Sequence, residues 1–396
     1  MATTNKIEKG ELQQVLDKTL DWSRKTGYKG YNKHDGLNSP VLNLLLGWSK
    51  WPRLVAIQGV MRFPVNLRPL FFTPQTYNPK GLALFTMALL DQFRISQDPS
   101  QLQEAETLLS LLKELKSPGD WNGICWGYHY PWQDAGFFAP KNTPNAVVTS
   151  FVCEAFLEAF RVTKKQEYLD TVSSAINFFL KDLKILKDTP QELCLSYMPV
   201  KMSVRVMDVS ILIGAVLAQQ ATLSHSNKFE TAERLVRYVV NCQTDYHAWW
   251  YTDPPSDSHI SHDNYHTGFI LDALDRYMKA TGDTQWQDQY DAGLKFYAEH
   301  LFNDDGSPRW MHDKDYPHDI HGAAQGILTF SRHLDTHQHL VKKITDWTLK
   351  RMYEDGRFYY QETAFYRKKF TLLRWCNGWM SRAISFNLRY SSKLPV

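Results

Sequence analysis

A helix-turn-helix pattern recurs along this chain at intervals of about 55 to 65 residues, and it limits the possible folds more than any single motif does. Each unit begins with a turn that contains a Pro or a polar residue, continues with an apolar helix and ends with a second helix. The six starts are marked by Pro79, Pro144, Asp208, Asp263, Asp319 and Trp375. Because one such unit cannot bury its apolar surface alone, the repetition predicts a ring of packed helical hairpins.

The first helix of each unit is apolar around its whole circumference, as residues 81–90 and 211–218 illustrate. Helices of this kind are buried on all sides, so they belong inside the ring. We therefore expect inner helices over residues 79–95, 144–161, 208–223, 264–280, 319–334 and 375–389.

The second helix of each unit carries one apolar stripe and one charged face, which is typical of a helix with one side in water. These outer helices are predicted over residues 101–116, 166–182, 228–243, 285–302 and 337–352. The last inner helix has no partner after it, but an amphipathic helix over residues 11–26 can supply one.

The fold class predicted is therefore all-α, an (α/α)6 barrel of six helical hairpins. We expect a single domain over residues 1–396, in which 1–77 form an N-terminal helix and a lead-in and 78–396 form the repeats. The lead-in is rich in Pro, Asn, Trp and Arg and is expected to hold one short helix, around residues 41–48.

Asp-Gly or Asn-Gly turns beside aromatic residues recur just before inner helices, in residues 120–126, 304–310 and 354–360. Such sequences predict short β-hairpins or tight turns. In a ring of inner and outer helices these segments gather with the inner-helix N-termini at one end, which we call the mouth. The site is expected at this mouth.

Composition excludes several classes of function. The net charge is +3 with mixed signs, so no basic field for nucleic acid is present. The longest apolar run, 209–218, is far shorter than the ~20 residues of a membrane span. Five widely spaced cysteines and a polar N-terminus predict a reduced, cytoplasmic protein.

Ionisable side chains cluster at the starts of the inner helices. The catalytic candidates are Asp208, Asp263, Tyr265, His266 and His321, and candidates for binding at equivalent positions are Asn145, Arg205, His318, Asp319, Arg374 and Trp375. An Asp at a helix start also acts as an N-cap without further function. Both interpretations stay open for Asp208, Asp263 and Asp319.

Aromatic side chains cluster in the loops that precede inner helices, and 14% of all residues are aromatic. Clusters of this kind form platforms for the apolar faces of sugar rings, although a loop that buries its own aromatic side chains is the alternative. The substrate-binding candidates from these loops and from the segment before the last inner helix are Trp126, Tyr128, Trp132, Gln133, Trp249, Trp250, Tyr366 and Arg367.

A metal site is a weaker alternative. His262 and His266 are four residues apart, and His259 lies nearby. The spacing does not match His-Glu-x-x-His, and no cysteine joins the group. Neither a phosphate-binding loop nor a nucleophile elbow is present. The sequence therefore predicts no metal and no cofactor.

Several motifs occur in order in residues 125–133, 137–144, 264–272, 318–325 and 374–380. With them the chain resembles polysaccharide-biosynthesis proteins of the VpsJ type, over roughly residues 75–390. The resemblance implies a six-hairpin toroid and a place in the synthesis of exported polysaccharides. It does not imply a particular reaction.

The fold expected is similar to that of unsaturated glucuronyl hydrolases, N-acylglucosamine 2-epimerases and glucuronyl C5-epimerases. Asp208 stands where the hydrolases carry a catalytic Asp. The phrases that begin at Asn264 (Asn-Tyr-His-Thr) and Ala324 (Ala-Gln-Gly) resemble those of C5-epimerases.

The resulting hypothesis is an enzyme that acts on an acidic, uronic-acid-type oligo- or polysaccharide, including its lipid-linked or nucleotide-sugar forms. In it, Tyr265, His266 and His321 exchange a proton at C5 while Arg205, Arg367 or Arg374 holds the carboxylate. Two alternatives stay open. One is glycoside hydrolysis by a pair among Asp208, Asp263 and Asp319. The other is a glycan-binding component without catalysis.

Overall fold

The computed structural model of the chain describes residues 2–202, 204–226 and 228–392. Six inner helices pack in sequence order, and the last packs against the first, which closes the ring. They are α4 (Pro79–Ser96), α6 (Ala146–Thr163), α8 (Met207–Leu223), α10 (Asn264–Thr281), α12 (Ile320–Ser331) and α14 (Trp379–Ser391). The predicted (α/α)6 barrel is confirmed.

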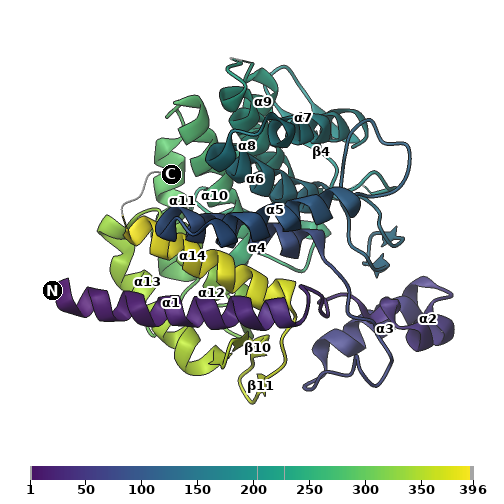
Figure 1. The fold of residues 1–396 in the computed structure, drawn as a ribbon. Helices are drawn as coiled ribbons and strands as arrows, with labels where there is room; N and C mark the ends of the chain where they lie inside the picture. Colours follow the sequence, from purple (N-terminus) through teal and green to yellow (C-terminus); the bar gives the residue numbers. More distant parts are fainter. Residues whose placement is uncertain (1, 203, 227, 393–396) are drawn as a thin grey trace.

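Each inner helix packs against one outer helix. The outer helices are α5 (Pro99–Glu114), α7 (Gln166–Lys181), α9 (Glu230–Val240), α11 (Gln287–His300), α13 (Leu334–Met352) and α1 (Ala2–Lys25). Figure 1 shows α1 beside α14, the two ends of the chain. The expected pairing of the N-terminal helix with the last inner helix is therefore confirmed.

Local sequence explains where most inner helices begin. Side chains cap four of them, since Asn78, Asn145, Asp263 and Asp319 each accept a hydrogen bond from a backbone N–H of the first turn. The sixth begins differently, with a π-helical turn (Arg374–Gly378) that leads into α14. Among the described residues, no helix combines the length and the apolar character that a bilayer span requires.

Short antiparallel strands occupy the loops between the helices. The two-stranded pairs are β1 (Trp132–Gln133) with β2 (Phe138–Ala139), β3 (Ile185–Asp188) with β4 (Leu193–Leu195), β5 (Arg205–Val206) with β6 (Thr252–Asp253), and β8 (Tyr353–Glu354) with β9 (Arg357–Phe358). A three-stranded sheet has the order β7 (His318–Asp319), β10 (Gln361–Glu362), β11 (Arg367–Lys368). In it Gln361 lies opposite Asp319.

One of the three segments forms a regular β-hairpin, and the chain reverses or bends sharply in the other two. Residues 354–360 contain the turn between β8 and β9, residues 304–310 contain a tight turn enclosed by an isolated bridge, and residues 120–126 contain a bend followed by another bridge. In these bridges Gly127 pairs with Pro144 and Phe302 with Pro308. The Phe302–Pro308 bridge is flanked by backbone hydrogen bonds from Asn303 to the carbonyl of Ser307 and from Arg309 to that of Leu301.

The lead-in contains two helices rather than the single one expected. They are α2 (Pro40–Leu46) and α3 (Lys50–Arg62), and Figure 1 shows both standing outside the ring. Their core is small and separate from that of the barrel, with Leu37, Leu42, Ala56, Ile57 and Val60 at its centre. The sequence pattern hides α3 because apolar residues occupy its exposed side as well as its buried side.

Candidate active site

A cavity of about 710 Å³ opens at the mouth of the barrel. Side chains from the starts of five inner helices line it, together with side chains from the π-helical turn and the lead-in. From the predicted catalytic set, it brings together Asp208, Tyr265, His266 and His321. The fifth member, Asp263, lies directly behind His266.

The imidazole of His266 is oriented by Asp263. Its Nδ1 lies 2.9 and 2.8 Å from the two carboxylate oxygens. An ionised carboxylate only accepts hydrogen bonds, so Nδ1 carries the proton. Nε2 has no hydrogen-bond partner among the described residues, and the side chain of His266 lines the cavity. Asp263 also caps α10, so the cap and site interpretations both apply to this residue.

The ring of His321 is held between two aromatic rings. Its ring centroid lies 4.5 Å from that of Tyr265, nearly parallel at 9°, and 4.3 Å from that of Trp379. Neither ring nitrogen has a hydrogen-bond partner among the described residues. Burial and then the positive charge of Lys80 hold its pKa well below the ordinary value. His321 is therefore a neutral imidazole at neutral pH and can accept a proton.

Tyr265 lies between the two histidines. Its ring centroid is 4.4 Å from that of His266 and 4.5 Å from that of His321, and its buried side chain lines the cavity. Burial, with Asp263 and Asp319 nearby, raises the pKa of the phenol well above its ordinary value. Tyr265 is thus a proton donor rather than a phenolate.

Asp208 does not cap its helix. It lies in the first turn of α8, whose N-cap is Val206, and its Oδ1 has no hydrogen-bond partner among the described residues. Burial raises the pKa of this carboxyl, and the nearby positive charges of His266 and Lys80 oppose the rise. The N-cap interpretation is therefore wrong for Asp208, and a buried carboxyl without a partner points to function.

Three buried cations face the same cavity. Lys33, Lys80 and Arg374 are buried and line it, and none forms an ion pair with another described residue. The ammonium of Lys80 lies 3.8 Å from the ring centroid of Phe151, and that of Lys33 lies 3.9 Å from that of Trp375. In all, six Lys and Arg side chains line the cavity against two carboxylates. The arrangement suits an anionic ligand.

Burial changes the ionisation of the two lysines. It lowers the pKa of Lys33 to about 8 and that of Lys80 well below its ordinary value. For Lys33 the carboxylate of Asp319 opposes this effect, while for Lys80 the positive charge of Arg374 adds to it. An anion bound between them would restore the charged forms.

Aromatic rings cover much of the remaining wall. Among the predicted binding residues, Tyr128, Trp132 and Trp375 line the cavity, and Tyr197, Tyr251 and Trp310 join them. Asp319 positions one of these rings, because its Oδ1 accepts a hydrogen bond from the indole N–H of Trp375 at 2.7 Å. Its Oδ2 accepts one from Gln361 at 2.8 Å, so Asp319 caps α12 and braces the wall rather than lining the cavity itself.

Other predicted binding residues lie away from the cavity. Trp126 and Trp249 are fully buried in the barrel core, where their indole N–H groups donate to Leu112 and Val239 carbonyls. Trp250 packs on His262, with the ring centroids 4.2 Å apart. The alternative that these loops bury their own aromatic side chains therefore holds for Trp126 and Trp249, while Trp250 is partly exposed.

The remaining polar candidates have structural partners. Asn145 caps α6, Gln133 and His318 bond to backbone carbonyls, and Arg205 pairs with Asp253 at 3.0 Å. Two more lie on the β10–β11 hairpin. Of these, Arg367 donates to the carbonyl of Arg351, and Tyr366 is exposed at the tip. None of these six side chains lines the cavity.

His259, His262 and His266 do not form a metal site. Both ring nitrogens of His262 are engaged, Nδ1 with the carbonyl of Trp249 at 2.8 Å and Nε2 with the hydroxyl of Tyr246 at 2.9 Å. Within the described part of the chain, no group of three or more His, Cys, Asp or Glu side chains is arranged to hold a metal ion.

Sequence reasoning missed Lys33, His34 and Lys80. The first two belong to the lead-in, and the third to the first inner helix, for which no site residue is predicted from the sequence. A signal was present for Lys80, since it is the only charged residue among the first twelve positions of α4. A charge in the interior of a buried helix marks a functional position.

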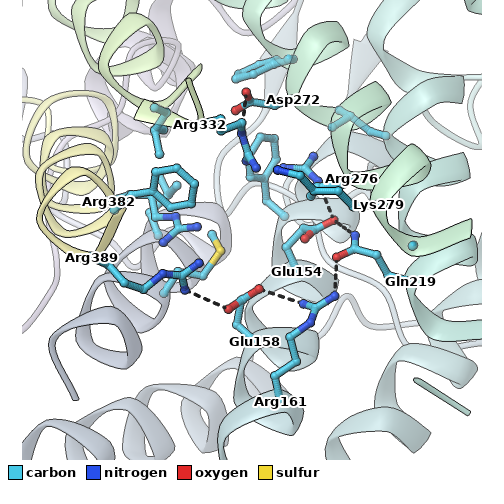
Figure 2. Close-up of a pocket in the computed structure, with 18 of the residues that line it drawn as sticks. Glu154, Glu158, Arg161, Gln219, Asp272, Arg276, Lys279, Arg332, Arg382 and Arg389 are labelled. Atoms are coloured by element: carbon cyan, nitrogen blue, oxygen red, sulfur yellow. Dashed lines mark hydrogen bonds and ion pairs between the residues drawn. The ribbon is translucent and has the colours of Figure 1, made fainter. Parts of the chain in front are cut away.

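A second cavity, of about 310 Å³, lies at the opposite end of the barrel, where the inner helices end. Figure 2 shows Arg and Lys side chains converging there with Glu154, Glu158 and Asp272. These charges are largely paired. Glu158 contacts Arg94 at 2.7 Å and Arg161 at 2.8 Å, and cations also suit the C-terminal ends of helices.

No family model matches the chain, and no curated protein matches its sequence. Solved structures do match. A cellobiose 2-epimerase from Bacillus thermoamylovorans B4167 is 13% identical with a TM-score of 0.62, over 80% of this chain and 88% of its own. This chain has the six-hairpin fold of carbohydrate-active enzymes.

Enzymes with other reactions share the same fold. A GH76 α-mannanase from Bacteroides thetaiotaomicron is 14% identical with a TM-score of 0.62, over 82% of this chain and 89% of its own. A polysaccharide lyase is 10% identical with a TM-score of 0.60, over 98% and 99%. Identities this low establish the fold, and the chemistry has to be argued from the cavity.

Proposed function

We propose that the protein is an enzyme of polysaccharide biosynthesis that transfers a proton at a carbon atom of an acidic, uronic-acid-type glycan, as epimerases and lyases do. One observation carries the proposal. Two histidines, His266 and His321, face a cavity that also holds three buried basic side chains, and among the described residues their free ring nitrogens have no hydrogen-bond partner and the basic groups no carboxylate partner. The resemblance to polysaccharide-biosynthesis proteins supports the substrate class.

The cations explain how a C–H bond could become acidic. A proton beside a carboxylate leaves only when the negative charge that develops on the carboxylate oxygens is stabilised. Lys33, Lys80 and Arg374 supply positive charge in a site largely removed from water, where its effect is strong. They replace Arg205 and Arg367 of the sequence hypothesis, which lie away from the cavity.

The acid and base follow from the environments of the rings. His321, with its lowered pKa, is the base in this proposal because it stays neutral and its nitrogens are free. Tyr265 is the proton donor through its neutral phenol. His266, whose Nδ1–H is held by Asp263, would take up a proton at Nε2 and return it from there. Tyr128, Trp132 and Trp375 would hold the apolar faces of the sugar rings.

The paired-Asp alternative has less support. Asp263 is engaged with His266 and Asp319 with Trp375 and Gln361, which leaves Asp208 as the one member of the three with a free oxygen at the cavity. Hydrolysis by two carboxylates requires both to reach the scissile bond. Asp208 suits the role of general acid in hydrolysis, so the effect of substituting it distinguishes hydrolysis from proton transfer at carbon.

Solvent deuterium is the decisive probe. We expect uronate oligosaccharides incubated with the protein in D2O to gain deuterium at one sugar carbon, detected by NMR and mass spectrometry. His321→Phe should reduce the exchange rate by about 100-fold or more, since it removes the base but keeps the aromatic packing. An unsaturated product would identify the lyase version.

A matched control is His312→Phe, because His312 lies outside the cavity and should leave exchange unchanged. Hydrolysis without deuterium incorporation, abolished by Asp208→Asn but not by His321→Phe, would contradict the proposal. Binding without any turnover would favour the glycan-binding alternative.

A further inference from the structure

The lead-in helices expose a large amount of apolar surface. Leu44, Leu45, Trp48, Trp51 and Val55 are all exposed, and the two indoles show 73% and 71% of their surface to solvent. Phe63, Val65, Leu70 and Phe72 are exposed in the segment that follows α3. Contiguous apolar surface is uncommon on a soluble protein and marks an interaction site.

This surface adjoins the mouth cavity. Gln58, Met61 and Arg62 of α3 line the cavity, and so do residues at the tip of the β10–β11 hairpin. At that tip Phe365 is 95% exposed. Lys368 of the same hairpin donates a hydrogen bond to the carbonyl of Met61 at 3.1 Å, which joins the two elements. We call α2, α3, residues 63–72 and the tip 363–366 the mouth rim.

The rim is basic as well as apolar. Between Asp35 and Asp91 the sequence contains no Asp or Glu at all. Lys50 and Arg62 are exposed within this stretch, and Arg53 is partly exposed. Of the carboxylates beside it, Asp35 is buried and pairs with Arg68 at 2.6 Å, Glu362 is buried and pairs with Arg351, and Asp134 lines the cavity. Exposed Trp, Leu and Phe side chains beside cations, without acidic residues, are typical of segments that lie in the interface of a membrane.

We propose that the mouth rim docks on the surface of a bilayer that contains anionic lipids. The exposed indoles and Phe365 would enter the headgroup region, and Lys50, Arg53 and Arg62 would contact the lipid phosphates. The charge favours this occupant over an apolar protein partner, since a cationic apolar surface complements an anionic lipid surface in both properties.

Docking in this way turns the mouth of the barrel toward the membrane. A glycan that enters the cavity from that side would be one held at the bilayer, such as a lipid-linked oligosaccharide. This consequence rests on the proposed function, whereas the docking itself does not. A vesicle-binding experiment therefore tests the rim even if no sugar substrate is found.

The test is co-sedimentation of the full chain with vesicles of phosphatidylcholine alone and with vesicles that contain about one third phosphatidylglycerol. We expect binding to the anionic vesicles that weakens with added salt. Trp48→Ser combined with Trp51→Ser should weaken binding by about 100-fold, roughly tenfold for each apolar ring withdrawn from the lipid. Lys50→Gln should weaken it by about fivefold.

The matched control is Ile185→Ser, which removes an apolar side chain that is 56% exposed on β3, outside the rim. It should bind vesicles like the parent, and circular dichroism should show that every variant is folded. Failure of the parent to bind anionic vesicles would overturn the proposal. So would a dimer in solution that the double Trp variant converts to monomer while vesicle binding stays absent, because a second copy would then cover the rim.

Discussion

Among the described residues, buried charged side chains are paired at one end of the barrel and lack partners at the other. At the far end, carboxylates and guanidinium groups neutralise each other, as Asp91 does with Arg382 and Arg389 and Asp272 does with Arg332. At the mouth, Lys33, Lys80 and Arg374 are buried without a carboxylate partner among the described residues. Both ends are built from the same six helices, so the helices alone do not explain the difference.

The comparison indicates which end stabilises the fold and which end binds. A buried charge without a partner costs stability and is retained where a ligand completes it. Where a buried charge has a partner, removing either member of the pair lowers stability, because the other is left buried and unpaired. We therefore expect substitutions at the far end to change unfolding and substitutions at the mouth to change ligand binding.

Asp91→Asn is expected to have the largest effect on stability. It leaves Arg382 and Arg389 buried without their shared carboxylate, which should lower the free energy of unfolding by about 3–5 kcal/mol. Denaturant titration followed by circular dichroism measures it. Asp355→Asn is the control, because its carboxylate is 82% exposed and pairs with Lys18 at the surface, so it should cost less than about 1 kcal/mol.

Lys80→Met should have a smaller effect on stability than Asp91→Asn, and it should raise the free energy of unfolding rather than lower it. Removing a buried amino group that has no ion pair among the described residues, while keeping the length of the stem, should raise the free energy of unfolding by about 1 kcal/mol or more. The variant should also bind acidic oligosaccharides more weakly, as calorimetry would show. Lys279→Met is the matched control, since Lys279 pairs with Asp275 at 3.0 Å, and it should not stabilise the protein. A Lys80→Met variant that unfolds more easily would contradict the comparison.

The smallest expected effect is a change in glycan affinity with pH. Burial lowers the pKa of Lys33 to about 8, below that of an exposed lysine, so the charge is present below this pH and is lost as the pH rises through it. Affinity for an acidic glycan should then fall above pH 8, by up to about tenfold per pH unit. In Lys33→Arg the guanidinium stays charged, and the decline should move to higher pH. An unchanged pH profile in this variant would exclude Lys33 from binding.

The sequence predicted much of the fold and part of the cavity. The periodic apolar helices and their Asn and Asp caps identified the ring and its mouth, and with them Asp208, Tyr265, His266, His321, Arg374 and Trp375 as neighbours at one end. It misplaced Trp126 and Trp249, because an aromatic residue in a mouth loop has the same local signature whether its ring faces the core or the cavity. It missed α3 because apolar residues lie on both sides of that helix.

What the sequence determined by itself was therefore the helical repeat, the caps and the end of the barrel where polar groups gather, since these depend on neighbours within a few positions. Only the tertiary structure decided which charges are neutralised. Asp91 meets Arg389 from the far end of the chain, and Lys33 enters the cavity beside Trp375 from the lead-in. Ion pairing and burial depend on distances across the ring, which no local pattern encodes.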